Sequence, residues 1–153
     1  MTTSKEQPWE KGNGGLGVLD PLIGSWTASA DSPMGSVQCR RTFSRILGDS
    51  CVLLEARWRL PGDQIYEEHA VYSAGDDGTV AFWSFTSDGK RSQGALADAT
   101  DIHAEAIAFE AQMPAGLARM VYWPGGEGVV NWAAESKSPT GWSRFAHHRC
   151  TAI

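Results

Sequence analysis

Residues 65–97, IYEEHAVYSAGDDGTVAFWSFTSDGKRSQGALA, contain three short runs with β-type composition that are separated by two Asp-Gly turns. The turns are Asp77-Gly78 and Asp88-Gly89, and the runs are 65–72, 79–86 and, more weakly because of Gly94, 91–97. Asp-Gly is a strong signal for a tight hairpin, because both residues tolerate the positive φ angles that such turns require. This stretch therefore predicts three consecutive antiparallel strands.

The same alternation of short runs and turns extends in both directions along the chain. Further strands are predicted at 26–30, 37–46, 51–60, 102–111, 117–123, 129–134 and 142–150. About ten strands, with a turn roughly every dozen residues, predict an all-β fold. Connections this short join neighbouring strands into an antiparallel meander, and a long meander avoids two exposed edges by closing on itself. We predict a closed up-and-down barrel.

Three segments complete the predicted organisation. Residues 98–112 (DATDIHAEAIAFEAQ) also contain good helix formers, but we favour the strand at 102–111 because the meander needs one there. Asp20 followed by Pro21 predicts a short helical turn before the first strand. The polar, glycine-rich residues 1–17 predict a flexible arm, which leaves 18–153 as a single barrel domain.

Composition narrows the class of protein. The chain has 153 residues, 42% of them hydrophobic, and a formal net charge of −5, so it favours one domain with an apolar core. A mildly acidic balance argues against binding to nucleic acid or to an anionic membrane surface. Residues 1–17 lack an apolar signal region, and the three cysteines form no CxxC pair, so we expect a cytoplasmic protein with reduced thiols.

Alternation predicts which side chains face the inside of the barrel. Three strands show a preferred inner set, which comprises Val52, Leu54, Ala56, Trp58 and Leu60, then Ala81, Trp83 and Phe85, and then Val130, Trp132 and Ala134. For 65–72 the choice stays open between His69 with Glu67 and Tyr72 with Glu68, so that either an imidazole or a carboxylate enters the lumen. For 142–150 neither face is clearly apolar.

A stepwise motif pattern resembles a known superfamily. Leu22-Ile23-Gly24-Ser25-Trp26 places a Gly-x-Trp at the start of the first strand, and Val71-Tyr72, Phe82-Trp83-Ser84 and the turns between them follow downstream. The pattern over roughly 19–150 is similar to bacterial lipocalin-like domains of unknown function, which belong to the calycins. The resemblance implies a ten-stranded calycin barrel, distantly similar to fatty-acid-binding proteins and nitrobindins.

Seven tryptophans suggest that the lumen binds a flat or apolar molecule. We expect seven side chains to line the ligand-binding cavity, namely Trp58, His69, Tyr72, Trp83, Trp132, Arg144 and His148. Arg144 is expected on the same face as His148, and the resemblance to fatty-acid-binding proteins implies that an inward arginine would anchor a carboxylate. The leading hypothesis is thus a barrel that binds a small hydrophobic molecule.

Two other functions stay open. The resemblance to nitrobindins implies haem as an alternative cofactor, with His148, or His147 in another register, as the axial ligand. Otherwise no cofactor or metal is expected, because adjacent histidines on a strand point to opposite faces. The second alternative is a structural barrel with a packed interior that binds a partner or forms a homodimer. No nucleophile elbow, P-loop or dinucleotide motif favours an enzyme, and the sequence leaves that question open.

Overall fold

The computed structural model describes residues 9–32 and 35–153, and it consists of one 3-10 helix followed by ten strands. Their bounds are η1 (Gly15–Leu22), β1 (Gly24–Ser32), β2 (Gly35–Ile46), β3 (Cys51–Leu60), β4 (Gln64–Ala74), β5 (Val80–Thr86), β6 (Arg91–Ala97), β7 (Ile107–Met113), β8 (Gly116–Pro124), β9 (Val129–Ser138) and β10 (Gly141–Ala152). Part of the predicted arm, residues 1–8, lies outside the described residues.

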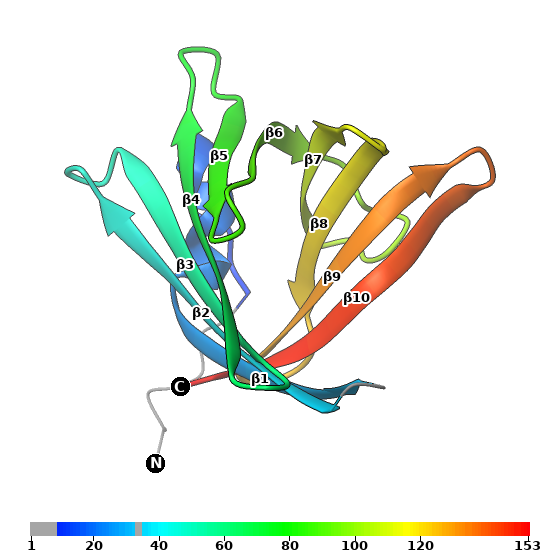
Figure 1. Cartoon of the computed structure of the whole chain (residues 1–153). Coiled ribbons are helices and arrows are strands. Elements are labelled where there is room, and N and C mark those ends of the chain that lie inside the picture. The colour runs from blue at the N-terminus through cyan, green and yellow to red at the C-terminus, as the bar shows by residue number, and fades with distance from the viewer. Residues whose placement is uncertain (1–8, 33–34) are drawn as a thin grey trace.

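The strands form one closed barrel. Each strand pairs antiparallel with the next along the chain, and β1 pairs with β10 through Trp26↔Ala152 and Thr27↔Thr151. Figure 1 shows the first and last strands side by side, so that the sheet has no free edge. The predicted closed up-and-down barrel is confirmed, and this architecture is compatible with a calycin-type fold.

One end of the barrel is closed by η1. Its Leu19 and Leu22 are completely buried in the main core, and the Trp26 Nε1–H donates a hydrogen bond of 2.9 Å to the Leu22 carbonyl. The helix starts at Gly15, directly after Gly14. Asp20 and Pro21 therefore lie inside it and not at its start, as their pairing had suggested. No helix in the described part of the chain is long and apolar enough to span a bilayer.

The segment between β6 and β7 differs from its prediction. Asp98–Ala106 forms turns instead of a strand or a helix, and β7 begins only at Ile107. This loop lies on the outer face of the barrel, where Ala99, Ile102 and Ala106 pack against Ala108 and Val121. This arrangement explains the mixed pattern of 98–112. Its first part, Asp98–Ala106, covers the sheet from outside, and its second part, from Ile107 onward, belongs to β7.

On β3 the side chains predicted to face the lumen do so, whereas on β5 the predicted inner set faces outward. Val52, Leu54 and Ala56 are buried in the core. On β5 the buried side chains are Val80, Phe82 and Ser84, while Trp83 and Phe85 are 45% and 58% exposed on the outer face. Both faces of β5 carry large aromatic rings, so apolar content alone could not decide between them. The register with β4, which opposes Phe82 to Tyr72, decides it.

A candidate ligand cavity above a buried arginine

A cavity of about 290 Å³ occupies the barrel end opposite η1. Its rim includes Tyr66 at the start of β4, Lys90 in the β5–β6 turn and Met113 at the end of β7. Its walls are mainly apolar, and the largest wall side chains are Trp58, Phe82, Phe109, Met120, Trp132 and Phe145. The lumen is therefore divided into a packed half next to the helix and an open half at the mouth.

Glu68 places a carboxylate in the wall of this cavity. The side chain enters from β4 on the same face as Ala70 and Tyr72, which answers the question that the sequence left open. Glu68 is 8% exposed, and its Oε2 accepts a hydrogen bond of 2.5 Å from the Ser84 Oγ–H on β5. His69 lies on the exposed outer face instead. A polar pair thus faces an otherwise apolar space.

Arg41 crosses the middle of the lumen beneath the cavity. It starts on β2, is 1% exposed, and its Nη1–H donates a hydrogen bond of 3.1 Å to the Tyr122 Oη on β8. The guanidinium carbon lies 4.2 Å from the ring centroid of Trp132 and 5.0 Å from that of Trp58. Two of its nitrogens, Nε and Nη2, have no hydrogen-bond partner. Burying a cation with so few polar partners is costly.

Other polar atoms around Arg41 are also unpartnered and buried. They are the Tyr72 Oη, the Trp132 Nε1 and the His148 Nδ1. Burial raises the pKa of Tyr72 and Cys39, and it raises the pKa of Cys150 to about 11. Burial, with Arg41 and His147 as smaller causes, lowers the pKa of His148. These groups are uncharged at neutral pH, so Arg41 and Glu68 are the charged side chains at this depth of the lumen, below Lys90 and Arg91 in the cavity lining.

Four of the seven expected ligand-lining residues come together inside the barrel. Trp58 and Trp132 face each other with ring centroids 6.4 Å apart, and both line the cavity. His148 stacks on Trp132 at 5.3 Å and 13°. Tyr72 lies deeper, against Phe109 at 4.9 Å. The other three, His69, Trp83 and Arg144, point away from the lumen.

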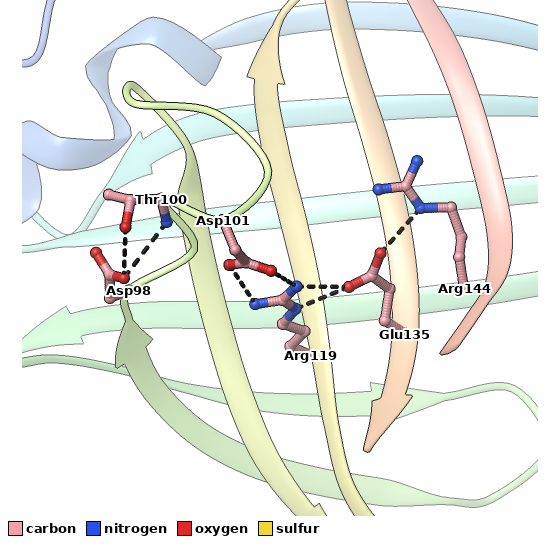
Figure 2. A network of polar contacts seen from close by, with 6 residues as sticks. All are labelled: Asp98, Thr100, Asp101, Arg119, Glu135 and Arg144. Atoms are coloured by element: carbon pink, nitrogen blue, oxygen red, sulfur yellow. Dashed lines mark hydrogen bonds and ion pairs between the residues drawn. The ribbon is translucent and has the colours of Figure 1, made fainter. Parts of the chain in front are cut away.

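The position of Arg144 corrects the prediction that it shares a face with His148. A β-bulge lies between Arg144 and Ala146, so Arg144 is opposite Glu135 while Ala146 is opposite Ala134. The extra residue moves Arg144 to the outer face, where its Nε–H donates to the Glu135 Oε2 at 2.9 Å. Figure 2 shows this contact as one end of a chain of ion pairs through Arg119 to Asp101.

Arg41 is the principal site residue that sequence reasoning missed. A usable signal exists in the run 37–46, where alternation puts Arg41 on the same face as Cys39 and Phe43. An arginine between an inward cysteine and an inward phenylalanine indicates a buried charge. Its neighbour Arg40 lies on the exposed face.

The cavity does not fit a haem. Its described lining contains no histidine, so it presents no axial imidazole. The His148 ring lies flat against Trp132, and His147 is on the outer face, stacked on Trp123 and hydrogen-bonded to Asn131 at 3.2 Å. Within residues 9–32 and 35–153, no three His, Cys, Asp or Glu side chains gather in a metal-binding group.

The lowered pKa of His148 predicts that the barrel loses stability in mild acid. A histidine whose pKa is lower when folded stabilises the protein above its unfolded pKa of about 6.5, and this contribution is lost as the pH falls through the folded pKa. His148→Phe keeps a flat ring on Trp132 but cannot be protonated. Urea unfolding at about pH 7.5 and 5 should therefore show a smaller loss for this variant than for the wild type.

The matched control is His69→Phe, because His69 is exposed on the outer face. It should keep the pH dependence of the wild type. If His148→Phe loses as much stability between the two pH values as His69→Phe does, burial of the imidazole is not the cause.

Comparison with protein-family models found no match, and comparison with functionally curated proteins found none either. The closed antiparallel barrel is compatible with the fold of calycins and fatty-acid-binding proteins. A fold of this kind carries many functions, so the function has to be argued from the cavity and its polar groups.

Proposed function

We propose that this protein is a lipocalin-like binding protein that holds one small, largely apolar molecule in the mouth of its barrel. The observation that carries the proposal is the cavity of about 290 Å³, whose walls are mainly aromatic and aliphatic and which contains the buried Glu68–Ser84 pair. Small-molecule sites are typically concave, mostly apolar and supplied with a few placed polar groups that orient the ligand.

The walls supply most of the affinity. Trp58, Phe82, Phe109 and Trp132 present large ring surfaces to the cavity. A ligand that buries about 200 Å² of apolar surface against such walls gains roughly 5 kcal/mol before the entropic cost of association is subtracted. The packed half of the lumen, in which Phe43, Tyr72 and Tyr122 are buried, keeps the apolar body of the ligand in the open half.

Filling the cavity tests the proposal. Ala134 is buried in the cavity wall, and Ala134→Trp would place an indole in the space that the ligand needs. We expect the wild type to bind the neutral apolar dye N-phenyl-1-naphthylamine saturably with a ratio of 1:1, and the variant to bind it at least about tenfold more weakly. The measurement is the dye's fluorescence increase on titration.

Two controls accompany this experiment. Ala104→Trp adds an indole to the exposed loop between β6 and β7, and Trp83→Ala removes one from the outer wall of β5, so neither should change the dye affinity. Absence of saturable binding by the wild type, or equal affinity in Ala134→Trp, would refute binding in the mouth.

A further inference from the structure

Two buried charged side chains flank Ala56 on the inner wall of the barrel. In the strand register, Ala56 of β3 is opposite Arg41 of β2 on one side and opposite Glu68 of β4 on the other. Neighbouring strands lie about 4.8 Å apart, so the two charged residues start roughly 10 Å from each other. Because Ala56 carries only a methyl group, the longer side chains of both residues extend past it into the lumen.

Neither of these charges has a charged partner. Arg41 donates one hydrogen bond, to the Tyr122 hydroxyl, and its Nε and Nη2 donate none. Glu68 accepts one, from the Ser84 hydroxyl. No ion pair joins Arg41 to Glu68 in the described structure. The cation has one hydroxyl and the weakly accepting thiols of Cys39 and Cys150 beside it, and the anion has one hydroxyl, so both retain unused hydrogen-bonding capacity on either side of Ala56.

The charges of Arg41 and Glu68 restrict which ligands can use their free donors and acceptors. At the depth of Ala56 the other groups around the two residues are uncharged, whereas Lys90 and Arg91 line the cavity nearer its mouth, so this deep part of the lumen holds one positive and one negative charge. A ligand with a single net charge would add an uncompensated buried charge, which is costly. A head group that is neutral or zwitterionic, with an acceptor for Arg41 and a donor for Glu68, satisfies both residues without that cost.

We propose that the head group of the bound molecule lies over Ala56 and bridges Arg41 and Glu68. The ligand class is then an apolar molecule whose head carries both an acceptor oxygen and an N–H or O–H donor, as a primary amide does. This inference rests on the proposed function. Glu68 already lines the cavity, whereas the guanidinium lies beneath Trp58 and Trp132. Trp58, the less buried of the two indoles, has to shift for the head group to reach Arg41.

Three probes with the same eight-carbon chain test the inference on the wild-type protein. Octanamide offers a donor and an acceptor, ionised octanoic acid offers acceptors only, and protonated octylamine offers donors only. In displacement of N-phenyl-1-naphthylamine near pH 7, octanamide should bind about tenfold more tightly than either charged probe, which corresponds to the loss of one hydrogen bond to a charged group.

Paired variants assign the effect to the two side chains. Glu68→Gln keeps the size of the side chain but removes its charge, and the matched control Glu55→Gln changes a carboxylate on the exposed outer face of β3. Arg41→Met removes the other buried charge, and its matched control, Arg40→Met, removes an arginine on the exposed face of the same strand. Both inner variants should remove the preference for octanamide, and both outer variants should keep it.

Failure of the inference can be told apart from failure of the proposed function. If octanoic acid binds as tightly as octanamide and Glu68→Gln changes neither affinity, the bridging head group is wrong while the cavity still binds ligands. If neither the dye nor any probe binds, the proposed function fails and the inference fails with it.

Discussion

Replacing Arg119 with methionine is expected to lower the free energy of unfolding by about 3 kcal/mol, the lower end of what removing one partner of a buried ion pair costs. Arg119 is 3% exposed and donates hydrogen bonds to both carboxylate oxygens of Asp101, at 3.1 and 2.7 Å, and to the Glu135 Oε1 at 2.9 Å. Glu135 is 4% exposed, so the variant leaves a buried carboxylate with only Arg144 as a charged partner. The anchor of the loop between β6 and β7 is lost as well.

Urea unfolding measures the loss of stability in Arg119→Met, and two further variants show whether it comes from the buried ion pairs. Arg149→Met removes an exposed arginine from β10 and should change stability by less than about 0.5 kcal/mol. Combining Arg119→Met with Glu135→Leu removes the stranded carboxylate and should recover part of the loss. A loss below about 1 kcal/mol for Arg119→Met alone would show that the network in Figure 2 contributes little to stability.

Replacing Arg41 with methionine and Glu68 with glutamine together, so that neither buried charge is left without the other, is expected to have the opposite effect and to raise the free energy of unfolding by about 1–2 kcal/mol. Arg41 is as deeply buried as Arg119, but it has one hydrogen bond, to a hydroxyl, and two unpartnered nitrogens. Replacing an unsatisfied buried charge with an apolar side chain of similar size is often stabilising. Methionine can adapt to the space between the Trp58 and Trp132 rings.

The gain should be visible in urea unfolding as a higher midpoint with an unchanged slope. Arg40→Met, on the outer face of the same strand, should leave the midpoint almost unchanged. A destabilised Arg41→Met/Glu68→Gln protein would mean that the contacts of the guanidinium with the two indoles and Tyr122 outweigh its desolvation. A stability gain combined with the loss of ligand preference would be the pattern expected of a residue kept for binding.

The two buried arginines illustrate how the same residue type serves different purposes in one barrel. Arg119 holds a loop to the outer wall, and its donors are used by two carboxylates. Arg41 lies inside, under a cavity, and most of its donors are unused. The satisfied arginine is therefore expected to contribute to stability, and the unsatisfied one to recognition.

Local patterns were sufficient for the architecture of this protein. Alternation with a period of two and turn signals such as Asp77-Gly78 act between residues close in the chain, so they predicted the strands, their antiparallel order and the closure of the barrel. The inner face of β3 also followed from its sequence, because Glu55, Arg57 and Arg59 share the opposite face. In 98–112 the same reasoning misplaced the start of the strand, because the loop Asp98–Ala106 also carries apolar residues, which pack against the outer face of the barrel.

The candidate site depended on contacts between residues far apart in the chain. The outward position of Trp83 is set by the register of β5 on β4, and that of Arg144 by a bulge against β9. Arg41 on β2 meets Tyr122 on β8 only because the sheet closes and brings opposite walls within reach of one side chain. The sequence by itself determined that a barrel forms, since strand periods and turns are local properties. Which side chains meet inside it was decided by register, bulge and closure, which exist only in the folded structure.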